Sequence, residues 1–249
     1  MRHILRRKPI SHIVEDNYVH AFVLYFFGIN FYKYSDATLE EVCISKGLDV
    51  ATVINRLESI TLPPDRRDIS LNAYPVDLII EYLKHTHHIY VKEKLPYVAN
   101  LIQDLEPSDD NKTISDLKFI FPFFVEDFVK HIYEEEDTLF NYILLLHQGL
   151  EKKVNYGKLF YALEKHSIQE FALDHSQEDD EMKGIRKLTN NYQLKDPGNL
   201  HLKVVYAELQ AFEQDLHIHA KIENEILFPK ALQLEFEINQ KIRKIIPSN

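Results

Sequence analysis

The sequence is poor in several features that define large classes of protein. It has one cysteine, Cys43, so an internal disulfide is impossible. Only six of its 249 residues are glycine, and long stretches rich in Leu, Ile, Glu and Lys lack turn-forming residues, which favours a mostly helical protein. Positive charge is not in excess either: the formal net charge is −10. Because such a surface repels phosphate backbones, we expect no nucleic-acid partner.

An apolar run long enough to span a bilayer is also missing. The main candidate, residues 21–31, has eleven residues, whereas a membrane-spanning helix needs about 20. Glu15 and Asp16 precede the run and no small-residue cleavage site follows it, so it does not match a signal peptide. We interpret it as a buried core helix. Together with the single cysteine, these features predict a cytoplasmic protein that does not associate with membranes.

Two parts are expected along the chain. The first, residues 1–62, is predicted to be a small helical domain. Thr38 and Glu41 form a capping-box pattern that begins one helix, and residues 48–60 indicate another. Residues 61–74 contain adjacent prolines and several charged side chains, which is typical of a linker.

The second part, residues 75–236, contains four long helical patterns. Segments rich in Pro, Gly and Asp separate them, and the region around Gly149 and Gly157 has room for extra helix. Short loops between long amphipathic helices are typical of an up-down-up-down bundle. We therefore predict an all-α fold in which the small N-terminal domain precedes a four-helix bundle, with helices at about 75–105, 114–146, 167–192 and 200–236.

Two of the four predicted helices carry the same spacing of candidate metal ligands. Glu135 follows His131 by four residues, Glu223 follows His219 by four, and a Leu-Phe pair comes four residues after each glutamate. Residues four apart lie on one helix face, one turn apart. A single such pair is usually a solvated surface pair, but two copies in matching register are far more specific. Inward-facing glutamates need a cation, because burying an unpaired charge costs several kcal/mol.

Lone histidines upstream complete the repeat. Almost equal intervals separate His88 from His131 and His175 from His219. Folding the two halves face to face would bring four imidazoles and two carboxylates together in the bundle core. Nitrogen donors with bridging carboxylates suit iron, or manganese less well, and the thiolates of a structural zinc or iron–sulfur site are absent.

Periodicity alone leaves the choice among neighbouring histidines open on the first bundle helix. A spacing of seven residues puts His87 on the same helix face as Ile80, and it puts His88 on the same face as Leu95. On the third helix, a capping box begun by Ser167 places His175 inside the helix. The other histidines are expected at the surface or in ordinary hydrogen bonds: His85, His147, His166, His201 and His217. The acidic run 178–181 is expected to be a solvated helix face.

Over nearly the whole chain, these motifs resemble the iron–sulfur cluster repair di-iron proteins, which have hemerythrin-like bundles. The resemblance rests on His88 seven residues before Leu95-Pro96, on the two His-x-x-x-Glu motifs, and on His175 ten residues before the segment 185–192. It selects His88 on the first helix. It implies two non-haem irons with oxo and carboxylate bridges, the carboxylates being Glu135 and Glu223. The six implied ligands are His88, His131, Glu135, His175, His219 and Glu223.

The N-terminal part resembles the same family through residues 27–31 and 39–48. One departure stands out: where family members usually carry adjacent cysteines, this chain has Tyr32 and Lys33. Cys43 lies inside a predicted helix and is interpreted as a small buried residue.

The resemblance implies a cytoplasmic stress protein that helps to restore iron–sulfur clusters damaged by nitric oxide or oxidants. Its partners would be damaged iron–sulfur proteins, and iron donation would be its mechanism, rather than conventional enzyme catalysis. Two other interpretations stay open: a hemerythrin-like protein that binds or senses O2 or NO, and a di-iron nitric oxide reductase. The residues by themselves indicate only the di-iron site.

Overall fold

The computed structural model describes residues 2–34, 36–59, 71–106, 111–151, 154–178, 180–194 and 199–245, without the side chains of residues 2, 3, 111, 174–178 and 245. Within these ranges the regular elements are helices, with no strand, which confirms the all-α prediction. Packing divides the chain into two compact units. Unit 1 joins residues 1–69 to 96–118 and 189–211, and unit 2 joins residues 70–95, 119–188 and 212–249. The predicted division into domains 1–62 and 75–236 stays a prediction about which parts fold independently.

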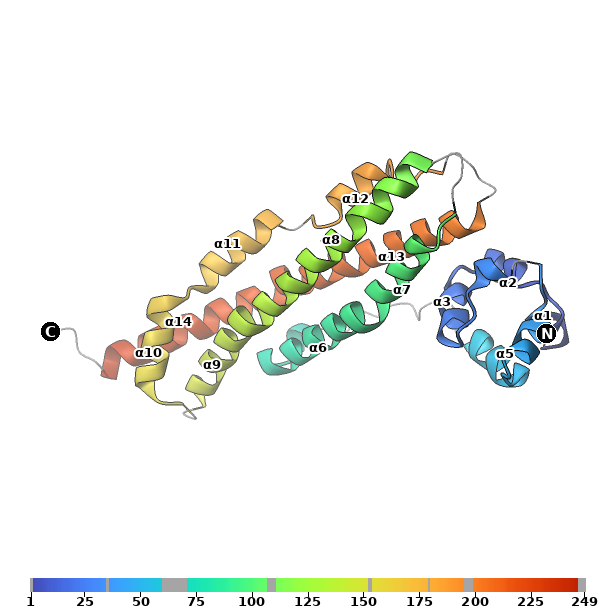
Figure 1. Ribbon diagram of the computed structural model, residues 1–249. Helices are drawn as coiled ribbons and strands as arrows, with labels where there is room; N and C mark the ends of the chain where they lie inside the picture. Colours follow the sequence, from blue (N-terminus) through green and yellow to red (C-terminus); the bar gives the residue numbers. More distant parts are fainter. Residues whose placement is uncertain are drawn as a thin grey trace. The chain divides into compact units, whose positions relative to one another are not determined.

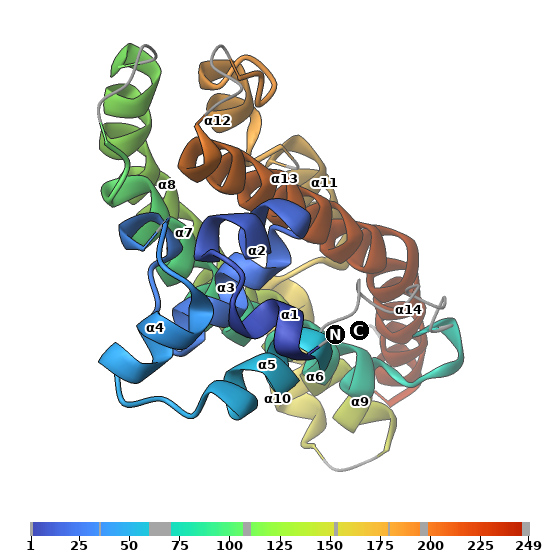
Figure 2. The ribbon, with the colours of Figure 1, turned by 90° about the vertical axis from the view of Figure 1, so that its right-hand side faces the viewer.

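The N-terminal part of unit 1 is a group of short helices (Figure 2). The Thr38–Glu41 capping box is present as predicted, with both of its hydrogen bonds. The apolar run 21–31 does not form a single helix, because the helix that contains its first part ends at Phe26. Gly28, with φ of +70°, then turns the chain so that Phe31 is buried again. The helices are α1 (Arg2–Arg6), α2 (Ile10–Asp16), α3 (Val19–Phe26), η1 (Phe31–Lys33), α4 (Leu39–Ser45) and α5 (Val50–Ser59).

Tyr32 and Lys33 have a structural role in unit 1. The hydroxyl of Tyr32 donates to Asp104 at 2.7 Å, and the ammonium group of Lys33 lies 3.1 Å from the same carboxylate. Asp104 follows α7 (Leu95–Gln103). The ring of Tyr32 also stacks on His201, at the start of α13 (Leu200–Ile222), with centroids 4.0 Å apart. These contacts attach the N-terminal segment to α7 and α13.

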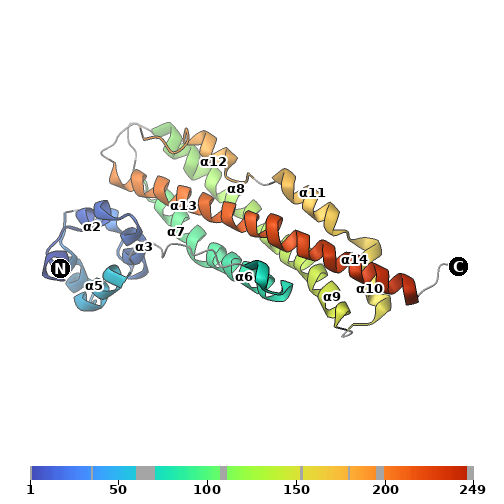
Figure 3. The same ribbon diagram turned by 180° about the vertical axis from the view of Figure 1, so that it is seen from behind.

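Unit 2 contains the larger part of the bundle, and helices α8 and α13 begin in unit 1 and continue into unit 2 (Figures 1 and 3). In it, α9 packs against α6 and α14, and α11 packs against α14. Among the described residues, three helices contain a π-helical turn, and short helices occur at η2 (Leu71–Ala73) and α10 (Tyr156–Lys165). The bundle elements are α6 (Val76–Ile89), η3 (Tyr90–Lys94), α8 (Asn111–Glu135), η4 (Glu136–Phe140), α9 (Asn141–Leu150), α11 (Ile168–Glu178), α12 (Lys183–Leu188), η5 (Glu223–Leu227) and α14 (Phe228–Ile245).

The predicted bundle helices agree with the observed ones except for the third. The first, second and fourth are each continuous through their π turns, and the fourth extends to Ile245 instead of 236. The third, predicted as one helix over 167–192, is instead two helices, α11 and α12, joined by a turn that includes Glu181 and Met182. No helix in the described part of the chain combines the length and apolarity needed to cross a membrane.

The core of unit 2 explains why the Leu-Phe pairs recur. Leu139-Phe140 and Leu227-Phe228 are all buried in one apolar cluster, which also contains Ile80 and Leu83 of α6. Each pair lies one turn beyond a glutamate of the repeat, and therefore fixes the helix rotation that turns the glutamate inward. The sequence repeat thus encodes both the candidate ligands and the apolar side chains that hold them in place.

We predict that His201 makes unit 1 less stable in acid. Burial lowers the pKa of His201 to about 4, from an ordinary value of 6.5. Between pH 6.5 and 4 the unfolded chain therefore binds a proton that the folded chain does not, so stability falls as the pH falls. Urea titrations of the wild type at pH 7 and pH 5 should differ by about 1–2 kcal/mol more than those of His201→Phe, which keeps an aromatic ring against Tyr32. Identical pH dependence of the two proteins would refute this assignment.

Candidate metal centre

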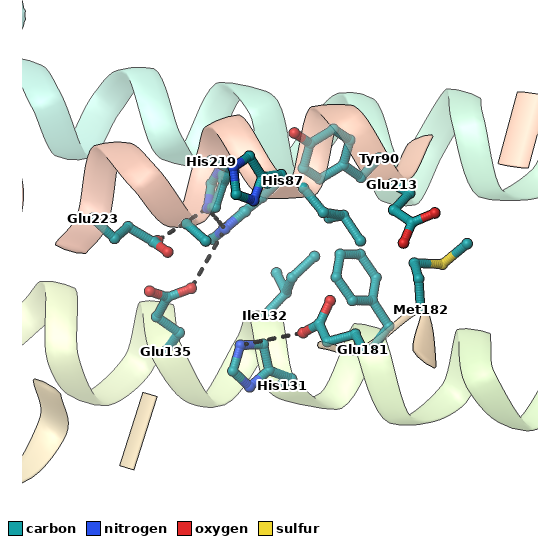
Figure 4. A pocket seen from close by; sticks show the side chains of 14 residues that line it. His87, Tyr90, His131, Ile132, Glu135, Glu181, Met182, Glu213, His219 and Glu223 are labelled. Atoms are coloured by element: carbon teal, nitrogen blue, oxygen red, sulfur yellow. Dashed lines mark hydrogen bonds and ion pairs between the residues drawn. The ribbon is translucent and has the colours of Figure 1, made fainter. Parts of the chain in front are cut away.

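Four side chains from three helices converge in the core of unit 2 (Figure 4). His87 comes from α6, Glu135 from the end of α8, His219 from α13 and Glu223 from the start of η5. One nitrogen or oxygen atom from each lies within 4.8 Å of the others. They are 3%, 7%, 8% and 1% exposed, in that order. We call these four residues the inner group.

A π-helical turn lies beside each part of the inner group. Turn η3 begins three residues after His87, η4 begins directly after Glu135, and η5 begins at Glu223 itself. Each π turn inserts one extra residue and so rotates the side chains on its two sides relative to each other. Such single turns inside α-helices occur frequently at functional sites. Here they let both the inner group and the following apolar residues face the core.

Hydrogen bonds fix the ring of His219. The hydroxyl of Thr86 donates to the backbone carbonyl of Leu83 at 2.7 Å. The hydroxyl oxygen of Thr86 also lies 2.9 Å from Nδ1 of His219. Because the hydroxyl proton is already donated to Leu83, this oxygen accepts the Nδ1 proton of His219. Nε2 of His219 then carries a lone pair that points into the inner group.

The ring of His87 is held in the same way. Its Nδ1 lies 2.9 Å from Oε1 of Glu136, a carboxylate that accepts the Nδ1 proton. Its other nitrogen, Nε2, lies 2.9 Å from Nε2 of His219. Two lone pairs at this separation repel each other unless a cation lies between them. A metal ion bound by two imidazoles at about 2.1 Å brings their nitrogens to roughly this distance.

The carboxylates approach the same point. Oε1 of Glu223 lies 3.0 Å from Nε2 of His219, and Oε2 of Glu135 lies 3.5 Å from Nε2 of His87. The other oxygen of Glu135, Oε1, is buried and has no hydrogen-bond partner among the described residues. A buried carboxylate oxygen without a donor is costly, and a metal ion would satisfy it.

The pKa shifts of the buried side chains also indicate that the inner group needs a metal ion. Burial raises the pKa of Glu135 well above its ordinary range, and the nearby charge of Glu223 raises it further. Burial, with the proximity of His219, lowers the pKa of His87 to about 3. The fold thus disfavours carboxylate charge and imidazolium in its core, and leaves neutral imidazoles as metal donors. Two imidazoles and two carboxylates form a donor set that suits iron.

The inner group lies at the wall of a pocket of about 110 Å³. Tyr90, Phe128 and Ile132 line part of it. At another part, Nε2 of His131 lies 3.6 Å from Oε1 of Glu181 (Figure 4). The pocket therefore combines an apolar wall with two separate sets of candidate ligands.

The structure places His87 of α6, and not His88, beside the other predicted ligands. His88, selected by the family resemblance, is exposed, and its neighbour His87 is the one that joins the inner group. The reason is η3, a five-residue π turn that begins at the buried Tyr90 and ends just before the buried Leu95. The extra residue breaks the heptad relation between His88 and Leu95, whereas His87 keeps its register with Ile80.

The other predicted ligands have mixed outcomes. Glu135, His219 and Glu223 come together as expected, and His131 faces the same pocket without belonging to the inner group. The side chain of His175 lies outside the described residues, so its predicted role stays a prediction. His85 and His217 are exposed, and His147 and His166 are partly exposed. His201 is largely buried, and its Nε2 has no hydrogen-bond partner among the described residues.

The acidic run contains a residue that sequence reasoning missed. Asp180 pairs with Arg186 near the surface, but Glu181 lines the pocket and faces His131 instead of belonging to a solvated helix face. No local pattern marks Glu181, because its direction is set by the turn between α11 and α12.

Comparison with known proteins agrees with a metal site here. The family model described as the hemerythrin HHE cation binding domain matches residues 79–231, which include the inner group, His131 and Glu181. The chain is 22% identical to the iron-sulfur cluster repair protein ScdA of Staphylococcus haemolyticus, over 91% of this chain and 99% of that one. It is 24% identical to ScdA of Staphylococcus epidermidis strain ATCC 12228, over 74% of this chain and 79% of that one. It is also 24% identical to the iron-sulfur cluster repair protein YtfE of Musicola paradisiaca, over 84% of this chain and 89% of that one.

The neighbouring histidines of α6 give the sharpest test of the inner group. We expect His87→Ala to weaken the binding of added Fe2+ by at least about tenfold, because it removes a ligand, and to reduce the rise in melting temperature on metal addition. His88→Ala should bind metal and melt like the wild type. Anaerobic titration of the metal-free proteins measures both. Loss of binding in His88→Ala with retention in His87→Ala would reject the inner group.

The hydroxyl of Thr86 gives a second test. Thr86→Val keeps the shape of the side chain but removes the acceptor for Nδ1–H of His219, so the ring loses its fixed orientation. Metal affinity should fall by about 10–100-fold, the usual effect of losing such an orienting bond. Thr86→Ser keeps the hydroxyl and should bind metal within about threefold of the wild type. Equal affinity for all three proteins would mean that the hydrogen bond does not orient a ligand.

Proposed function

This chain belongs to the hemerythrin HHE cation-binding family, and from that membership we propose that it holds two non-haem iron ions and takes part in the repair of damaged iron–sulfur clusters. The observation that carries the proposal is the inner group. It is a buried set of two imidazoles and two carboxylates in a chain whose relatives, similar over most of their length, are named iron–sulfur cluster repair proteins.

The proposed ligand set follows the structure where it differs from the family resemblance. His87 takes the place assigned to His88, and His131, Glu135, His219 and Glu223 keep their assigned roles. His175 is retained from the resemblance alone. Glu135 and Glu223 are the proposed bridges, since each lies in the inner group and each follows by four residues a histidine that lines the pocket.

The residues define how the site would hold iron. The Nδ1 hydrogen bonds of His87 and His219 keep both Nε2 atoms deprotonated and directed inward. The charges of Glu135 and Glu223 balance one divalent ion. When bound, iron supplies the metal that a damaged cluster has lost. In this scheme the donated iron is the substrate of the repair and the protein is its carrier. We place the protein in the cytoplasm, acting under nitrosative or oxidative stress.

A second candidate function rests on the pocket beside the inner group. Its wall of Tyr90, Phe128 and Ile132 is largely apolar, and its volume of about 110 Å³ holds a molecule as small as O2 or NO. These features suit a protein that binds or senses a diatomic gas, or one that reduces nitric oxide.

Repair can be measured with an aconitase-type enzyme whose cluster has been damaged by nitric oxide. Iron-loaded wild-type protein should restore its activity well beyond the same amount of free Fe2+. Glu223→Gln, which removes a carboxylate charge from the inner group, should lose most of this effect, and His88→Ala should keep it. No recovery with fully iron-loaded protein would reject the repair role. Reversible spectral changes with O2 or NO, or conversion of NO to N2O, would then favour the second candidate.

A further inference from the structure

The pocket contains a second pair of metal-donor groups outside the inner group. His131 lies on α8, one helical turn before Glu135, and Glu181 lies in the turn between α11 and α12. Their nearest atoms, Nε2 and Oε1, are 3.6 Å apart. This is longer than a good hydrogen bond, and both side chains line the same pocket as the inner group.

Charge favours a carboxylate at this position. The inner group offers two negative charges, from Glu135 and Glu223, and its imidazoles are neutral, so it balances one divalent ion. A second divalent ion beside it adds two positive charges, and His131 contributes none. A carboxylate facing His131 supplies both a negative charge and an oxygen ligand of the kind that iron prefers.

The other carboxylates at this part of the pocket are already engaged. Glu213 lines the pocket but forms an ion pair with Arg186, and Arg186 also pairs with Asp180. Glu181 lines the same pocket, and one of its ion-pair contacts is with a histidine that is itself a proposed metal ligand. Its place in the pocket beside His131 gives Glu181 the position of a ligand.

We propose that Glu181 and His131 together hold the second metal ion, at an outer position beside the inner group. The inference rests on the proposed function, since it assigns a ligand within the same dimetal site. The side chains of His131 and Glu181 are 30% and 26% exposed, whereas those of the inner group are at most 9% exposed. The outer ion is consequently the exchangeable one, and the inner ion is the retained one.

The test is stepwise loading of the metal-free protein with Fe2+ under anaerobic conditions, repeated with Co2+, whose visible spectrum reports the ligand set. The wild type should bind two ions per chain, and a chelator should remove one of them much faster than the other. Glu181→Gln keeps the size of the side chain but removes its charge. It should bind the first ion as the wild type does and the second at least about tenfold more weakly. Glu213→Gln, also in the pocket, should bind both normally.

The outcomes separate the two proposals. A wild type that binds only one ion would overturn both the dimetal site and the role of Glu181. A wild type that binds two ions, with Glu181→Gln binding both equally well, would overturn only the role of Glu181. Normal loading of Glu181→Gln together with loss of the second ion in His175→Ala would assign the outer position to His175 instead. Because tight binding of the first ion reports a folded bundle, loss of the second ion alone cannot be attributed to unfolding.

Discussion

The structure depends on the convergence of two carboxylates and two imidazole lone pairs in the core of a helical bundle. Without a cation this arrangement is unfavourable, because burying charge and bringing two lone pairs together both raise the free energy of the folded state, and packing does not compensate for this. With a cation, the same groups satisfy one another. Metal binding and folding of unit 2 are therefore coupled, so that part of the binding free energy stabilises the bundle.

The surrounding structure serves to hold these groups in one geometry. Thr86 and Glu136 fix the two histidine rings by accepting their Nδ1 protons. Phe140, in the core cluster, stacks on the ring of His87 with the two planes 7° apart. The π turns reconcile two demands that a regular α-helix cannot meet together: ligands directed at the site, and a continuous apolar face one turn later. Each of these features lies within one helical turn of a ligand.

What could be predicted from the sequence follows from this locality. The His-x-x-x-Glu pairs and their Leu-Phe neighbours lie within single helices, where spacing alone determines which side chains share a face. Periodicity leaves His87 and His88 open, and the family resemblance selects His88 through its spacing from Leu95. No sequence pattern marks the π turn η3, which lies between these histidines and Leu95. The direction of Glu181 was missed for a related reason. It depends on where α11 ends and α12 begins, which the packing of unit 2 decides rather than local propensity.

The single thiol adds a constraint on how such a protein works. Cys43 is fully buried, and burial raises the pKa of its thiol, so it is a poor nucleophile and a poor metal ligand. Tyr32 and Lys33, where the family resemblance implies a cysteine pair, are bound to Asp104 and serve packing. The candidate metal ligands among the described residues are therefore nitrogen and oxygen atoms. Those ligands divide into a buried inner group and the more exposed pair of His131 and Glu181. Under the proposed assignment of a second ion to this pair, the ion with the more exposed ligands can leave while the buried inner group still holds the other and stabilises the fold.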